Sequence, residues 1–345
     1  MSCTALARPV RLPVTFGSKP PRIDILHPGY KQNHNVLLTF SACDVPLIPW
    51  SQGEIWGLHH GTALTAGAII TNKIFDRVYF SHDQLGKHCI ETPREGTLAP
   101  GCYYLQVRKE SLSDGEATKS MTAGNLAHHA SATLSPSSES TSTPLVNNDY
   151  DYPIVPTFED WQFPHGKLPP EWDEQHLISP PECHHKERCY ATGLEMGLAK
   201  CYVVPSGTND WFVDNGMNTY SENIRFGRPI DDEGNKITLM SHIRSAFDDR
   251  TFVIVPKPSS RYPSSQSPSS TPTASTAYHQ PHEFAIHVIS TDSKPAVQFA
   301  NFYHNLTIQP QYIHMIRREF LFARFAWAIF PLLRQSGDRG RQVST

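Results

Sequence analysis

The sequence predicts an α+β protein, and three observations support this fold class. Short runs rich in β-branched and aromatic residues, typical of strands, occur early in the chain at 36–40, 78–80 and 102–107. Two more strand-like runs occur later, at 252–255 and 284–289. A largely apolar stretch from about Tyr312 to Leu333 predicts a helix packed into a core, which Pro331 should end or kink.

Two segments of low complexity divide the chain. Residues 111–147 are rich in Ser, Thr and Ala, and residues 258–281 are rich in Ser and Pro. Neither can bury enough apolar surface to offset the entropy lost on ordering, so we expect both to be disordered. The sequence therefore predicts a β-rich N-terminal domain at 20–110, a linker at 111–147, and a second domain at 150–335 with an insertion at 258–281.

The stretch from Trp56 to Ile70 lies between the first predicted strands and contains the adjacent pair His59 and His60. Neighbouring side chains on a strand point to opposite faces, so the two imidazoles do not naturally share one metal ion. We expect them to serve packing or a turn hydrogen bond.

Composition limits the possible partners and compartments. With 345 residues the chain can form two globular units, and its net charge of -3 provides no overall basic field to attract nucleic acid. The N-terminus lacks the apolar segment of a signal peptide, and the apolar run at 320–333 is too short to span a bilayer. Seven scattered cysteines suggest reduced thiols. We expect an intracellular protein of the cytoplasm or nucleus, neither secreted nor bound to a membrane.

The segment from Arg188 to Lys257 contains the most informative motifs. They are R-C-Y-A-T-G at 188–193, K-C-Y-V-V-P at 200–205, N-K-I-T-L-M-S-H-I-R-S-A-F-D at 235–248 and F-V-I-V-P at 252–256. This order and spacing closely resemble the HNH endonuclease (ββα-metal) family, in a form common in fungal proteins. The N-terminal stretch also resembles the region that precedes the nuclease-like domain in those proteins.

The resemblance implies a ββα-metal domain with its core at 188–257, followed by C-terminal helices. In the family two strands form a hairpin, a helix packs across it, and one divalent ion such as Mg²⁺ lies between them. The first motif histidine is the general base, an asparagine orients it, and a histidine on the helix binds the metal ion. Together they hydrolyse phosphodiester bonds in nucleic acid.

Both of these histidines are replaced in this chain. Tyr202 stands at the general-base position, where a phenol with a pKa near 10 is a poor base at neutral pH. Arg244 stands at the metal-ligand position, and a guanidinium has no lone pair to give. Asn235 matches the orienting asparagine. The sequence therefore predicts no metal ligand at this site, and a divalent ion is expected only if the protein is active.

Several alternatives remain at the sequence level. Arg244 either binds a phosphate or nucleic acid in place of the metal, or points to solvent and pairs with Asp248 one turn later. His242 and His184 are possible substitute histidines, although His242 should face nearly opposite to Arg244 on a helix.

Three functions follow from these alternatives. The first is a degenerate HNH nuclease that has lost most or all metal-dependent cleavage. The second is an active endonuclease that uses a substitute histidine. The third is a non-enzymatic interaction protein that uses the fold as a platform. Nucleic acid is a possible partner of the first two, and the sequence does not identify a protein partner.

Overall fold

The computed structural model describes residues 19–32, 34–44, 56–73, 75–108, 152–173, 187–222, 227–258 and 282–334. The predicted linker at 111–147 and residues 259–281 of the predicted insertion lie outside these ranges. Their expected disorder, and the division of the chain at the linker, stay predictions.

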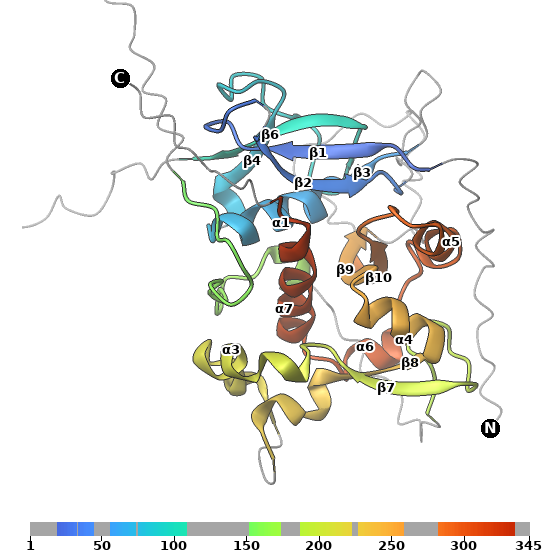
Figure 1. Cartoon of the computed structure of the whole chain (residues 1–345). Coiled ribbons are helices and arrows are strands. Elements are labelled where there is room, and N and C mark those ends of the chain that lie inside the picture. The colour runs from blue at the N-terminus through green and yellow to red at the C-terminus, as the bar shows by residue number, and fades with distance from the viewer. Residues whose placement is uncertain are drawn as a thin grey trace, which may run out of the picture.

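A four-stranded sheet forms the N-terminal layer (Figure 1). Its strands are β1 (Arg22–Leu26), β2 (Val36–Ser41), β4 (Val78–Ser81) and β6 (Gly101–Val107). The spatial order is β2-β1-β6-β4, and only the β1–β6 pair is parallel. The three strands expected at 36–40, 78–80 and 102–107 are confirmed to within one residue at each end.

The helix α1 (His60–Thr71) is buried along its whole length beneath this sheet. Its alanine, glycine and threonine residues are small enough for close approach. A side chain at Gly67 would place its Cβ 2.6 Å from Leu105 Cδ1 on β6. The short strand β3 (Leu58–His59) leads into α1 and pairs with β5 (Thr97–Leu98).

The helix α7 (Arg318–Ile329) runs through the middle of the molecule and contacts α1 and the later strands (Figure 1). The single helix expected over 312–333 is wrong in its extent. The short α6 (Pro310–Ile313) comes first, and α7 begins only at Arg318 because the backbone N–H of Arg317 donates to Gly234 O at 3.1 Å instead of continuing a helix. The chain then leaves α7 in a 3₁₀ turn that contains Pro331, as expected of proline.

Two antiparallel hairpins, four further α-helices and several short 3₁₀ turns complete the described structure. Strands β9 (Phe252–Pro258) and β10 (His282–Val288) form the hairpin beside α7, which confirms both later strand predictions. The second hairpin is formed by β7 (Leu198–Tyr202) and β8 (Lys236–Met240), and together with the following helix α4 (Ser241–Asp248) it carries the candidate site. The other helices are α2 (Pro170–Asp173), α3 (Asn209–Asp214) and α5 (Lys294–Tyr303).

One hydrophobic core joins the N-terminal sheet to the rest of the chain. Trp172 on α2 illustrates the packing, since its ring centroid lies 5.0 Å from Phe322 on α7 and 5.6 Å from Phe284 on β10. Small sheets and several helices thus share one interior, and the fold mixes α and β structure as predicted. None of the helices in the described ranges combines the length and apolar character that crossing a bilayer requires.

Candidate functional site

A hairpin followed directly by a helix carries the motif residues. Strands β7 (Leu198–Tyr202) and β8 (Lys236–Met240) are antiparallel, with Tyr202 opposite Lys236. The helix α4 (Ser241–Asp248) begins immediately after β8 and packs on both strands (Figure 1). Ile243 and Phe247 are fully buried and form its inner face, as their spacing of four residues predicts.

Tyr202 ends β7, and its hydroxyl is committed to a hydrogen bond. The hydroxyl donates to Asp231 Oδ1 at 2.9 Å. This bond, together with partial burial, raises the pKa of Tyr202 even though the Lys236 ammonium lies 5.9 Å from the ring centroid. The phenol is therefore held in its protonated form, which is the opposite of what a general base requires.

Asn235 is fully buried just before β8 and braces the loop that follows Tyr202. Its Oδ1 accepts the backbone N–H of Val204 at 2.7 Å. Its Nδ2 donates to Val204 O at 3.0 Å and to Ile230 O at 2.9 Å. All three bonds go to backbone atoms, so the amide holds two loop segments together beside the hairpin.

Arg244 lies on the exposed side of α4. Its Nε donates to Asp248 Oδ2 at 3.2 Å, one helical turn later. This agrees with the interpretation in which Arg244 points to solvent and pairs with Asp248. The guanidinium thus makes its ion pair within its own helix.

Of the two possible substitute histidines, only His242 lies within the described residues. His242 is also exposed on α4, and its Nε2 lies 2.7 Å from the hydroxyl of Tyr303 on α5. That contact turns the imidazole toward α5. His184 lies outside the described residues.

A buried arginine outside the motifs, Arg324, links the end of β7 to the end of α4. Arg324 on α7 is 1% exposed, and its guanidinium donates to Val203 O, just after Tyr202, and to Phe247 O on α4. The guanidinium carbon lies 3.9 Å from the Phe247 ring centroid, and burial lowers the pKa of Arg324 to about 9. Its only sequence signal is a charge inside the apolar run at 320–333.

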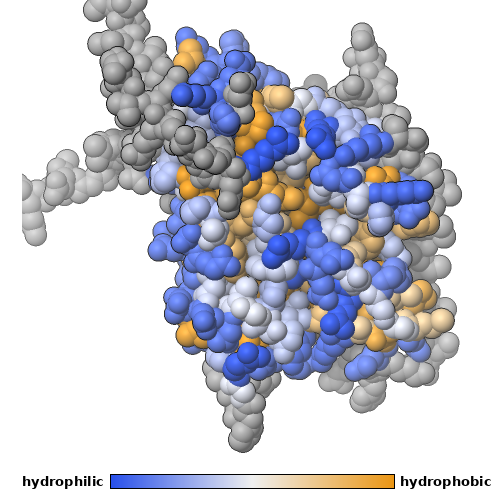
Figure 2. Space-filling model, in the orientation of Figure 1, coloured by the Kyte–Doolittle hydropathy of each residue, from blue (hydrophilic) through white to orange (hydrophobic). Residues whose placement is uncertain are grey.

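Most cations around the hairpin are paired with carboxylates, whereas Arg250 and Arg324 lie over the Trp327 ring. The Glu233 carboxylate accepts hydrogen bonds from the ammonium groups of both Lys200 and Lys236. The other pairs are Arg188 with Glu195, Arg228 with Asp231, Arg244 with Asp248, and Arg317 with Glu222. Positive and negative charge therefore alternate, and this surface lacks the basic excess that is typical of a phosphate-binding face. Figure 2 shows a surface that is hydrophilic over most of its area, with smaller apolar patches between.

The described residues of the hairpin and α4 contain no cluster of three side chains able to hold a metal ion. One such cluster does occur elsewhere in the described ranges, formed by Asp44, His287 and His304. The motif positions and the available metal ligands are thus in different parts of the molecule.

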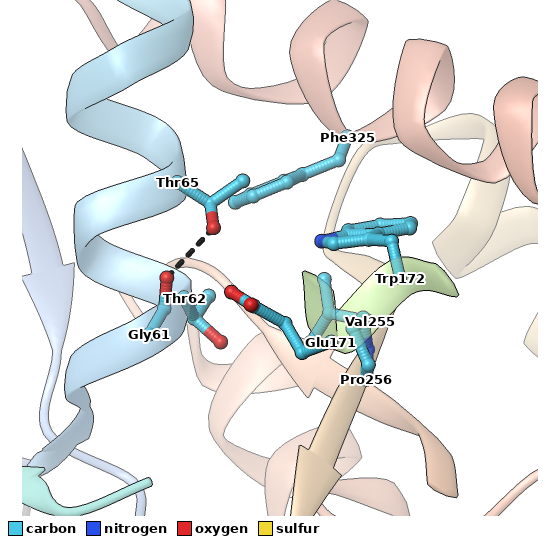
Figure 3. Close-up of a pocket in the computed structure, with 8 residues that line it drawn as sticks. All are labelled: Gly61, Thr62, Thr65, Glu171, Trp172, Val255, Pro256 and Phe325. Atoms are coloured by element: carbon cyan, nitrogen blue, oxygen red, sulfur yellow. Dashed lines mark hydrogen bonds between the residues drawn. The ribbon is translucent and has the colours of Figure 1, made fainter. Parts of the chain in front are cut away.

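Two hollows among the described residues have no predicted site residue in their walls. The first, of about 160 Å³, lies where α1, α2, β9 and α7 meet. Figure 3 shows Thr65, Trp172 and Phe325 gathered around it, with Glu171 as the charged residue in its wall. Its interior has no free space for even a water-sized molecule, so it is far below the range of ordinary ligand pockets. The second, of about 600 Å³, lies between the end of α1 and the segment 161–167.

The pair His59 and His60 serves packing and turn hydrogen bonds, as expected from the sequence. The Nδ1 of His59 accepts the backbone N–H of Thr62 and caps α1. The Nδ1 of His60 lies 2.8 Å from Thr92 O.

Comparisons of the chain with protein-family models, with curated proteins and with solved structures give no match.

Proposed function

We propose that this chain is a degenerate HNH nuclease, in which the hairpin and helix are kept and metal-dependent phosphodiester cleavage is lost or strongly reduced. The motif order along 188–257 and the arrangement of β7, β8 and α4 support the nuclease ancestry. Asn235 also braces the loop beside the general-base position, which is consistent with its place in the motif.

The main support for a loss of activity is the set of hydrogen bonds that Tyr202 and Arg244 make. The Tyr202 hydroxyl donates to Asp231, which raises the pKa of Tyr202 and keeps the phenol protonated, so it is a poor base toward water. Arg244 offers only donors, and one of them, Nε, pairs with Asp248. The base and the helix ligand are therefore absent together, and each absence alone should lower the rate by orders of magnitude.

The charge around the site favours a platform for protein partners over tight binding of nucleic acid. The cations on the surface of the hairpin region have carboxylate partners, and the whole chain carries a net charge of -3. Exposed ion pairs are weak, so a phosphate could still compete for individual side chains. The competing function is an interaction protein, for which we expect no affinity for DNA or RNA at moderate salt.

The direct test is a cleavage assay on supercoiled plasmid and single-stranded DNA with Mg²⁺ or Mn²⁺. It compares the wild type with the double variant Tyr202→His/Arg244→His. The double variant should cut at least about 100-fold faster than the wild type, because a positioned general base alone contributes roughly 10²–10⁴ in rate.

A second double variant, Tyr202→Phe/Arg244→Ala, serves as the control. It removes the same two side chains without supplying imidazoles, so it should be as inactive as the wild type. Metal-dependent cutting by the wild type that disappears in this control would overturn the proposed loss of activity. A folded Tyr202→His/Arg244→His variant that does not cut would reject the nuclease scaffold and favour the interaction protein.

A further inference from the structure

Three side chains from distant parts of the chain meet between the N-terminal sheet and the β9–β10 hairpin. Asp44 follows β2, His287 lies on β10, and His304 follows α5. One ligand atom from each lies within 4.8 Å of the others. The three side chains are 7%, 1% and 4% exposed, so the cluster is in the interior.

His287 is the unusual member of this cluster. Among the described residues neither of its ring nitrogens has a hydrogen-bond partner, and the nearest carboxylate oxygen, Asp44 Oδ2, is 3.8 Å from Nδ1. A buried polar ring without partners is unfavourable, and an ion is one of the few things that account for it. Burial holds the pKa of His287 well below its usual range, and the neutral imidazole is the form that binds metals.

Asp44 is fixed in place and ionised. Its Oδ2 accepts the backbone N–H of His59 at 2.8 Å, and its Oδ1 accepts the Lys257 ammonium at 2.6 Å. Burial raises the pKa of Asp44, but the charge of Lys257 and the contact with His304 outweigh burial and hold it well below its usual range. A carboxylate anchored by backbone in this way is typical of a supported metal ligand.

We propose that Asp44, His287 and His304 form a binding site for a divalent metal ion of the zinc class, in which Lys257 neutralises Asp44 when the metal is absent. Two imidazoles and one carboxylate match a common zinc ligand set that leaves a fourth position for water. This site is separate from the hairpin and helix, and does not depend on the proposed nuclease ancestry.

Two existing interactions must be given up when a metal ion binds at this site, and both losses weaken binding. The N–H of Val288 donates to His304 Nδ1 at 3.1 Å, so the His304 proton resides on Nε2, which lies 3.0 Å from Asp44 Oδ1. A metal ion on Nε2 requires that proton to move to Nδ1, and the Val288 bond is then lost. The ion also displaces the Lys257 ammonium from Asp44, although Lys257 keeps Asn305 Oδ1 at 2.7 Å. Metal and Lys257 therefore compete for one carboxylate.

This competition gives opposite effects for two substitutions in the full-length chain. In His287→Leu the apolar side chain removes both unpartnered nitrogens, so the melting temperature in EDTA should equal or exceed that of the wild type, while the response to Zn²⁺ is lost. In Lys257→Met the Asp44 carboxylate loses its counterion, so the melting temperature in EDTA should fall. This variant should also bind Zn²⁺ at least about tenfold more tightly, because a like charge beside the ion is removed.

The measurements are thermal unfolding with and without Zn²⁺, titration calorimetry, and metal content per chain. Wild type should bind one Zn²⁺ that Mg²⁺ does not replace, since Mg²⁺ prefers oxygen ligands. The variant His88→Ala, which removes an exposed imidazole that belongs to neither site, should behave as wild type. The proposal is overturned if Zn²⁺ does not stabilise the wild type, or if His287→Leu keeps the same zinc affinity and content.

Discussion

At the candidate site, a single side chain can hold several backbone segments in place, and Asn235 is the clearest example. Its amide satisfies a donor and an acceptor of Val204 and the carbonyl of Ile230. It is fully buried, so water cannot replace these bonds if the amide is removed. The residue therefore stabilises the loop whether or not any chemistry takes place beside it.

Replacing Asn235 with alanine should lower the free energy of unfolding by about 2–4 kcal/mol, because three buried backbone groups lose their partner. Urea unfolding followed by circular dichroism measures this. The same substitution at the half-buried Asn218 should cost less than about 1 kcal/mol. Equal effects at both positions would mean that the bracing role is wrong.

At the scale of secondary structure, α4 is held to the core by one narrow face. Ile243 and Phe247 are buried, whereas His242, Arg244 and Ser245 are exposed. Phe247 packs against Phe252 on β9, with ring centroids 5.2 Å apart, and against the Arg324 guanidinium. Arg324 also donates to the Phe247 carbonyl at the end of α4, which accepts the backbone N–H of Arg250 as well, and a cation at this end is favourable for the helix dipole.

The substitution Phe247→Ala should destabilise the protein by about 3–5 kcal/mol, because a large buried ring is removed and Arg324 loses one of the two rings on which it stacks. Ser245→Ala on the exposed face of the same helix is the matched control and should change stability by less than about 0.5 kcal/mol. Thermal and urea unfolding report both values. A loss below about 1 kcal/mol for Phe247→Ala would show that α4 is not anchored through this ring.

For the whole molecule, the shared core is the main constraint. The backbone N–H of Val155 donates to Ile70 O at the end of α1, and the Tyr152 hydroxyl donates to Leu105 O. On the other side, the N–H of Arg334 donates to Leu37 O on β2. The segments before and after residues 111–147 are therefore joined by hydrogen bonds and share one hydrophobic core.

A protease site introduced near residue 130, within the predicted linker, tests this interdependence. After cleavage the two fragments should co-elute in size-exclusion chromatography and separate only in denaturant, because separation exposes a large apolar surface on both. The uncut protein carrying the same inserted site is the control. Fragments that separate in native buffer, each still folded, would favour two independent domains.

Local patterns in the sequence predicted the elements well. The strand runs, the buried face of α4 and the end of α7 before Pro331 follow from hydrophobic periodicity and from the chemistry of proline. The start of α7 was not predictable, because the backbone N–H of Arg317 bonds to Gly234 O, far away in the sequence. The all-buried α1 was also not assigned, since its small residues give little periodic signal. Strand β1 was missed as well, although Ile23 and Ile25 alternate with the polar residues Arg22 and Asp24.

The sequence by itself determined which chemistry positions 202 and 244 cannot perform. A phenol is a poor base at neutral pH and a guanidinium cannot bind a metal ion, and both properties belong to the side chains themselves. Only the tertiary structure decided which groups these side chains meet, and that Asp231 raises the pKa of Tyr202. It also brought Asp44 to His304, 260 residues away in the chain. Contacts between such distant residues depend on the packing of whole elements, and no local pattern in the chain specifies them.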